Sequence, residues 1–431
     1  MKPTFVTSSL FLRPGSGLVA LILVGAGQAQ PAPAVSLPAL VSEIVAHHPE
    51  RRFYEAEIAA AKSSARVAGR LGDPEVSLDL GQKRLRDAAG AKLGDGIVWS
   101  VSVTQTFEWP GRLSLRKAIA NRQVELAELG VARFEHALAA RARTLAFGLH
   151  TAHARAAAIR EVSDRFAALK ETFLARDPAG ITPLLETRVI EASELVLQRR
   201  ATEAELAVQA ALIELNLLRG AAVDAPLTVA VPALAFHAMP PTAELLGAAR
   251  ERNFEYRTRV LELEQQGLAV RLARHERHPG ISVGPYLSRD QVGDRETIVG
   301  LGLSMPLPVS GRSAGGVETA EARRRQAEAA ALVALRELDR QVVTAAQAFA
   351  TKLAEVRRWS PDSLQKFREA AELADRHYRT GAVPIATYVE LQQSYLDAVE
   401  ALLDTQGEAL AAGLKLQQLT GLDLNPVELK P

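Results

Sequence analysis

Histidine pairs are the residues of this chain whose spacing could most readily bind a metal ion. His150 and His153 are three residues apart on a predicted helix, as are His275 and His278, so each pair would share one helix face. Two imidazoles without a third ligand make an incomplete zinc or copper site. The chain has three Met and no Cys, which excludes thiolate sites and disulfides. We interpret these histidines as exposed or interfacial, and expect no metal site and no cofactor.

Catalysis is not predicted by any arrangement in the sequence. Gly311, Gly315 and Gly316 are only superficially like a phosphate-binding loop, because no Gly-Lys-Ser/Thr follows them. We find no Ser-His-Asp set and no carboxylate pair with a catalytic spacing. The acids of one predicted loop could select ions, and we interpret them as charges that keep the loop hydrated: Asp290, Asp294 and Glu296. The protein is therefore predicted not to be an enzyme.

The first residues have the pattern of an export signal. Lys2 and Arg13 precede a short apolar run at 18–24, and small residues that suit cleavage follow. We predict a signal peptide at 1–29, with cleavage there or as late as residue 34. No later run approaches ~18 continuous apolar residues, so no transmembrane helix is expected. Without Cys the mature protein cannot be lipidated at an N-terminal cysteine, and a net charge of +1 gives no bias toward nucleic acid.

The chain repeats its own markers 200 or 201 residues apart. Gly111-Arg112 recurs as Gly311-Arg312, Gly180 recurs as Gly381, and Leu218-Arg219-Gly220 recurs as Leu419-Thr420-Gly421. One constant, long spacing indicates a duplicated unit rather than a solenoid of small repeats. The predicted organisation is a first repeat at 37–220, a linker at 221–241, a second repeat at 242–421 and a short tail at 422–431.

Each repeat contains one stretch with the period of β-strands. Hairpins are predicted at 74–108 and 279–308, with polar loops at 82–96 and 288–296. Their apolar side chains alternate with small or polar ones. Four apolar side chains are assigned to a lipid-facing side: Val101, Val103, Leu301 and Leu303. The alternative is a soluble protein in which the apolar side of each hairpin packs against a protein core.

Helical periodicity fills most of the remaining chain. Residues 37–70 predict a helix interrupted at His48-Pro49, and 112–177 predict one long helix without Pro. Ser360-Pro361 should break the corresponding helix of the second repeat. Return helices are predicted at 183–219 and 384–420, and a short strand at 227–231. Apolar residues at sustained 3-4 spacing along the long helices are typical of a coiled-coil seam.

The predicted strands cannot form a closed structure within one chain. In a membrane, lipid leaves open strand edges unsatisfied, so the hairpins would have to close into a barrel. Known bacterial barrels start at eight strands, which a dimer of this chain would supply, whereas a trimer would supply twelve. Strand closure alone leaves both possibilities open.

In this arrangement the chain resembles the TolC-like outer-membrane efflux proteins. The resemblance covers residues 37–422 and rests on the two hairpins, the two Gly-Arg pairs and the two glycine turns. The run from Gly180 to Arg188 is similar to the tip motif of the CzcC-like branch, which serves heavy-metal efflux. The implied fold is mainly α with a small β part. Duplicated antiparallel helices would form a trimeric periplasmic α-barrel, and four strands per chain would join a shared twelve-stranded outer-membrane β-barrel.

The resemblance also implies partners and a passive function. The homotrimer would sit in outer-membrane lipid and dock onto a periplasmic adaptor and an inner-membrane pump, of the RND type for metal cations. Export of drugs, or type I protein secretion, is the alternative within this architecture. A periplasmic coiled-coil scaffold without a pore is the alternative from another class. Neighbouring genes or export phenotypes, rather than this sequence, would distinguish them.

By the same resemblance, the helix turns would form the periplasmic tip, where the pore narrows and the adaptor binds. The turn residues assigned to adaptor contact are Gly180, Ile181, Thr182, Gly381, Ala382 and Val383. Tyr378 matches the family's gate tyrosine, and Glu186 and Glu390 match acidic tip positions. Thr387 and Val383 depart from the best-known pattern, in which an acid and an arginine stand there. Three arginines are possible substitutes in the closed state: Arg188, Arg376 and Arg379.

Overall fold

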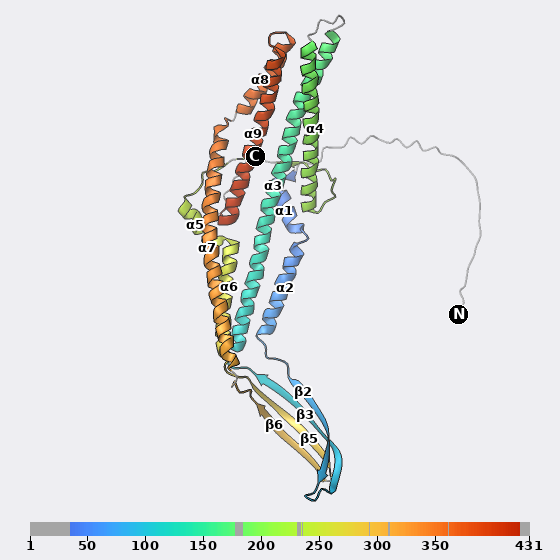
Figure 1. The fold of residues 1–431 in the computed structure, drawn as a ribbon, viewed down its shortest axis with the longest axis vertical. Helices are drawn as coiled ribbons and strands as arrows, with labels where there is room; N and C mark the ends of the chain where they lie inside the picture. The colour runs from blue at the N-terminus through green and yellow to red at the C-terminus, as the bar shows by residue number, and fades with distance from the viewer. Residues whose placement is uncertain are drawn as a thin grey trace, which may run out of the picture. The chain divides into compact units, whose positions relative to one another are not determined.

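The computed structural model describes residues 35–176, 184–230, 234, 236–292, 294–308, 311–360 and 362–422 (Figure 1). The predicted signal peptide and the tail beyond residue 422 lie outside these ranges. The helices are α1 (Leu37–His47), α2 (Arg51–Ala68), α3 (Arg112–Arg176), α4 (Leu184–Arg219), α5 (Thr242–Arg252), α6 (Phe254–His275), α7 (Arg312–Arg358), α8 (Ser363–Arg379) and α9 (Ile385–Thr420). The strands are β1 (Val35–Ser36), β2 (Glu75–Arg86), β3 (Lys92–Phe107), β4 (Val229–Ala230), β5 (Ile281–Val292) and β6 (Asp294–Ser304).

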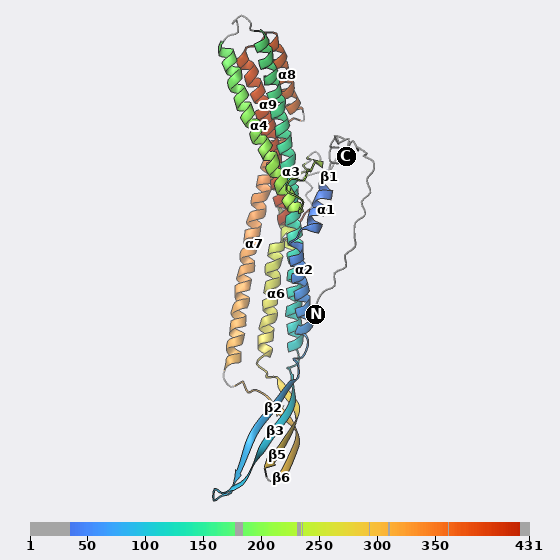
Figure 2. The same cartoon turned by 90° about the vertical axis from the view of Figure 1, so that its right-hand side faces the viewer.

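The helix breaks follow the sequence pattern. The expected interruptions at His48-Pro49 and Ser360-Pro361 are confirmed, since α1 ends at His47 and α7 ends at Arg358. The long helix α3 runs unbroken through 65 residues, from the side of the sheet to the opposite end (Figures 1 and 2). It packs against α2, α4, α6 and α9 and so joins both repeats. Among the helices that the structure describes, none has the length and apolar content to cross a bilayer.

The two hairpins form one antiparallel sheet in the order β2-β3-β5-β6. The first hairpin therefore pairs directly with the second, through β3 and β5. The expected polar loops at 82–96 and 288–296 are wrong in extent, because β2 continues to Arg86 and β5 continues to Val292. Polar side chains do not end a strand as long as the neighbouring strand supplies partners for its backbone hydrogen bonds. Lys83 is one example, because it lies opposite Gly96 of β3.

Related apolar clusters from the two repeats form the middle of the helical part. In the first repeat, Leu40 and Ile44 of α1 pack against α3 and α4. In the second, Leu245 and Ala249 of α5 pack against α7 and α9. The strand expected at 227–231 is present as β4 and pairs in parallel with β1, a strand that the periodicity did not predict. This pair attaches the start of the first repeat to the linker between repeats.

Candidate gate and membrane-facing sheet

The turn between α8 and α9 is built by local backbone chemistry. Gly381 has a φ of 76°, and its N–H donates to the Tyr378 carbonyl at 2.9 Å while the Ala382 N–H donates to the His377 carbonyl at 2.8 Å. This paired pattern is a Schellman cap, which glycine favours because its backbone is free to adopt positive φ. Pro384 then precedes α9. The chain is thereby reversed within a few residues, which sets α9 beside α8.

The structure describes only some of the residues assigned to adaptor contact. Gly381 and Ala382 are exposed, and Val383 is half-buried against the apolar cluster that α3, α4, α8 and α9 share. Gly180, Ile181 and Thr182 lie outside the described residues. Figure 2 shows the α8–α9 turn at the end of the helices opposite the sheet. Exposed backbone at such a turn is open to a partner.

Tyr378 lies at the end of α8 in an aromatic stack. Its side chain is 7% exposed, and its ring stacks on Tyr388 of α9 with centroids 5.3 Å apart. Tyr388 in turn contacts Phe166 of α3, at 5.1 Å between centroids. Burial, followed by the nearby negative charge of Glu186, raises the pKa of Tyr378 to about 12. The phenol therefore keeps its proton and lies near the carboxylate of Glu186.

The structure thus brings together two predicted tip residues from different repeats. Glu186 is in the first turn of α4, where a negative charge also favours the positive end of the helix dipole. Tyr378 comes from the last turn of α8. The sequence suggested each by its position in its own repeat, and their contact joins the two repeats.

The other predicted tip residues do not join this contact. Arg188 is exposed and pairs with Glu191 on its own helix at 2.7 Å. Arg379 pairs with Asp375, also on its own helix, at 2.9 Å. Of the other predicted tip residues, Thr387 has a half-buried side chain, whereas the side chains of Glu390 and Arg376 are exposed. The ion pairs described for Arg188 and Arg379 therefore stay within one repeat.

A polar network next to the aromatic stack was missed by the sequence analysis. Gln392 is 1% exposed; its amide donates to the Ala371 carbonyl at 2.8 Å and its oxygen accepts from Arg165 at 3.2 Å. Arg165 also pairs with Glu161 at 2.5 Å, and Glu161 accepts from Arg368 of α8 at 3.1 Å. The network connects α3, α8 and α9. Gln392 and Tyr395 continue the helical face of Tyr388, a spacing that could have indicated this network.

The histidine pairs lie in the part of the chain that the structure describes. No group of three potential ligands is found among those residues. Burial, reinforced by the charge of His153, lowers the pKa of His150. His278 stacks on Trp109 with ring centroids 4.8 Å apart, where the sheet meets the helices. This histidine contributes to packing at that junction.

One face of the sheet is apolar across all four strands. Leu78, Val101, Leu287 and Val299 lie opposite one another in successive strand pairs, so their side chains share this face. Of the side chains predicted to face lipid, Val101 is half-buried in the middle of this row. The others are exposed, at 42% for Val103, 71% for Leu301 and 74% for Leu303. Such a large exposed apolar surface indicates contact with something other than water.

The opposite face has small and polar side chains. Ser77 lies opposite Ser102, Ser102 opposite Tyr286, and Tyr286 opposite Gly300. The outer strands β2 and β6 each have one neighbour in this sheet. The sheet is therefore an open segment with one apolar face, one small or polar face and two edges whose backbone groups can pair with another chain.

Comparison with known proteins agrees with this arrangement. Residues 245–422 match the family model described as outer membrane efflux protein. No protein of curated function matches the chain in sequence. A membrane protein from Pseudomonas aeruginosa is 20% identical with a TM-score of 0.72, over 89% of this chain and 90% of that one. The CmeC outer membrane channel of Campylobacter jejuni is 15% identical with a TM-score of 0.71, over 89% of this chain and 85% of that one.

A further solved structure captures the same fold in an open channel. The open state of the MtrE outer membrane channel from Neisseria gonorrhoeae is 16% identical with a TM-score of 0.69, over 90% of this chain and 89% of that one. The matched family and these channels transport molecules and are not enzymes. The chain therefore has the fold of the outer-membrane efflux channels, and its second half carries the sequence pattern of the outer membrane efflux protein family.

Proposed function

We propose that this chain is the subunit of a homotrimeric outer-membrane channel in a tripartite efflux system. The observation that carries the proposal is the open sheet, with an exposed apolar face and two unclosed edges. Lipid cannot pair with backbone groups, so the edges must be closed by further copies. Three copies give a barrel of twelve strands, whose apolar face meets lipid and whose polar face lines the lumen.

The proposed channel reaches into the periplasm through its helices. Residues 1–29 direct export as a signal peptide, and the helix turns farthest from the sheet dock onto a periplasmic adaptor. The exposed turn at Gly381 and Ala382 supports this placement. The adaptor would connect the channel to an inner-membrane pump of the RND type, while the channel itself makes and breaks no covalent bond.

The proposed gate is the contact between Tyr378 and Glu186. It holds the end of α8 against the start of α4, and three such contacts would surround the pore in a trimer. Opening would separate these helices and move the phenol away from the carboxylate. Glu390 is exposed on α9, and a ring of such acids would concentrate cations at the tip.

The proposed substrates are heavy-metal cations. The acids Glu186 and Glu390 at the tip support a cationic cargo, and the run ending at Arg188 is similar to the metal-efflux branch. A deletion strain should become sensitive to cobalt, zinc, cadmium or copper. Sensitivity to a drug panel alone would reassign the channel to drug efflux, and loss of a secreted protein would reassign it to type I secretion.

Fractionation tests the channel itself. The protein should be recovered from the outer-membrane fraction as an oligomer that dissociates on heating, and chemical crosslinking should trap three chains. Recovery as a soluble, detergent-independent protein would instead establish a periplasmic scaffold without a pore.

A further inference from the structure

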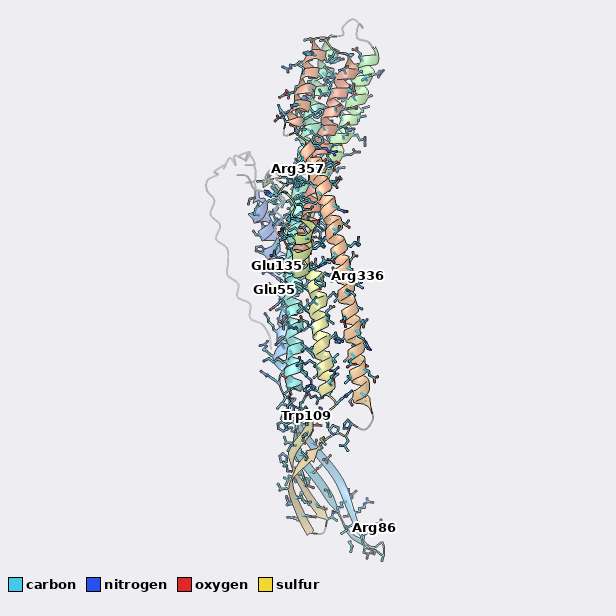
Figure 3. All side chains as sticks on the ribbon, turned by 90° about the vertical axis from the view of Figure 1, so that its left-hand side faces the viewer. Glu55, Arg86, Trp109, Glu135, Arg336 and Arg357 are labelled. Carbon is cyan, nitrogen blue, oxygen red and sulfur yellow. The ribbon has the colours of Figure 1, made fainter. Side chains whose placement is uncertain are left out.

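The apolar face of the sheet changes character toward the hairpin tips. On β2, Val76, Leu78 and Leu80 are followed on the same face by Gln82 and Arg84, since side chains alternate along a strand. These residues lie progressively farther from the helices. Figure 3 marks the two ends, with Trp109 where the sheet meets the helices and Arg86 at the far end. The lipid-facing surface of β2 therefore ends in basic residues.

Strand register places basic residues of the other strands on the same face. Leu80 lies opposite Trp99, and Trp99 lies opposite Arg289, so all three share the apolar side. Arg295 is four residues from Val299 along β6 and shares its side. Lys92 lies opposite Arg86 beyond the register shift at the end of β2. We call the resulting set the basic collar, and its members are Arg84, Arg86, Lys92, Arg289 and Arg295.

The acids of β2, β5 and β6 lie on the other face. Asp79 lies two residues before Gly81 on the lumen side, and Asp290 lies opposite Glu296 on the same side. Lys83 is also on this side and pairs with Asp290. The acids of β2, β5 and β6 thus lie on the lumen side, whereas every base of these strands except Lys83 lies on the apolar side.

One acid interrupts the collar without neutralising it. Asp95 lies opposite Arg84 and contacts it at 3.7 Å, and it contacts Lys92 at 3.1 Å. Five bases against one acid leave four positive charges per chain on this face. The Arg84 and Lys92 side chains are 64% and 61% exposed, so both can still reach a ligand.

We propose that the basic collar binds the phosphate groups of lipid A in the outer leaflet of the outer membrane. This inference rests on the proposed function, which places the sheet in that membrane with its hairpin tips outward. Guanidinium groups bind phosphate with paired hydrogen bonds, and basic residues at the edge of an apolar surface bind anionic lipid headgroups. The acyl chains of the same lipid would contact Leu78, Leu80 and Val299 below the collar. Free phosphate lacks these chains and would bind weakly.

Lipid binding to the full-length protein in detergent tests the proposal. The variant Arg84→Gln/Arg86→Gln/Lys92→Gln removes three collar charges, and Lys83→Gln is the matched control on the lumen face of the same strand. Native mass spectrometry would follow titration with bisphosphorylated lipid A, with dephosphorylated lipid A and with inorganic phosphate. The triple variant should bind bisphosphorylated lipid A at least about tenfold more weakly, with binding by Lys83→Gln unchanged.

The other arms separate the sources of binding. Dephosphorylated lipid A should bind wild type about as weakly as the phosphorylated lipid binds the triple variant, and inorganic phosphate should not compete. Equal binding of both lipids, or equal loss in Lys83→Gln, would overturn the proposal. Competition by inorganic phosphate would reduce the collar to a simple anion site and overturn the lipid assignment.

Fractionation distinguishes failure of this inference from failure of the proposed function. If the wild-type protein is absent from the outer-membrane fraction, the proposed function is wrong. If the wild type and the triple variant both form oligomers and bind lipid A equally, only the proposed lipid A site is wrong. If the triple variant does not assemble, Arg295→Gln on β6 provides a milder change, and it should lower lipid A binding while leaving the oligomer intact.

Discussion

The two repeats are equivalent in the sheet and different at the tip. Their hairpins pair through β3 and β5 and place apolar side chains on one common face. At the tip, α3 is continuous, whereas its counterpart is divided into α7 and α8. The proposed gate pairs Glu186 of one repeat with Tyr378 of the other, and the position 201 residues after Glu186 is Thr387.

This difference follows from what each region contacts. In the proposed barrel, lipid would present the same apolar environment to every strand, so both hairpins would need the same pattern. At the tip the repeats contact each other, and a contact between an acid and a phenol requires different residues on its two sides. A duplicated sequence can therefore keep its copies alike where they meet lipid and diverge where they meet one another.

The largest effect is expected from charge on the lipid face, where the repeats should respond alike. Val101→Arg in the first hairpin and Leu301→Arg in the second should each cost about 2–4 kcal/mol near the bilayer midplane and prevent assembly. The amount of heat-dissociable oligomer in the outer membrane measures this. Ser102→Arg, on the lumen face, is the control and should assemble. Equal tolerance at both faces would contradict the barrel.

At the polar network near the tip, substitutions at corresponding positions of the two repeats should differ in their effect on stability. Arg165→Met removes the donor to the side-chain oxygen of buried Gln392 and should cost about 1–3 kcal/mol in free energy of unfolding. Lys366 is the position 201 residues later and is exposed, so Lys366→Met should change little. Urea unfolding followed by helical circular dichroism compares the two. Equal destabilisation would show that the network contributes nothing specific.

Two corresponding glycines should also differ. Gly220 has a φ of 72° with open space at its Cβ position, so Gly220→Ala should cost roughly 1–2 kcal/mol from backbone strain alone. At Gly421 an added Cβ would lie 2.8 Å from the Arg252 Cβ, a contact that requires backbone movement. Gly421→Ala should therefore lower thermal stability more than Gly220→Ala. The reverse order would contradict the packing of α5 against the end of α9.

The gate contact should affect opening more than stability. Combining Tyr378→Phe with Glu186→Gln removes the hydroxyl and the negative charge that lie near each other, and the net loss of stability should be about 0.5–1.5 kcal/mol per subunit. Channel conductance in planar bilayers should rise, because the closed tip loses the contact between its repeats. Arg188→Gln is the control, since its ion pair with Glu191 stays on α4. Unchanged conductance in the double variant would remove these residues from the gate.

The smallest effect is expected at the exposed acid of the second repeat. Glu390→Ala should lower the preference for cations without changing assembly, because a ring of acids attracts cations to the pore. The reversal potential under a salt gradient measures this preference. A preference equal to that of wild type would place Glu390 outside the conducting path.

Local patterns in the sequence determined much of the fold. Strand and helix periods, the Gly-Arg pairs and the breaks at His48-Pro49 and Ser360-Pro361 each depend on neighbouring residues. The duplication also predicted that one chain supplies only part of a closed barrel. Strand ends were predicted poorly, because Lys83 and Asp290 look like loop residues until their cross-strand partners are known.

Tertiary structure alone decided which residues meet. The contact of Tyr378 with Glu186, the burial of Gln392 beside Arg165 and the pairing of β1 with β4 join segments far apart in the chain. Periodicity assigns a residue to a face of its own helix or strand, and it carries no information about what that face meets. Packing of α3, α4, α8 and α9 supplies that information, because close packing allows few arrangements of four helices at once.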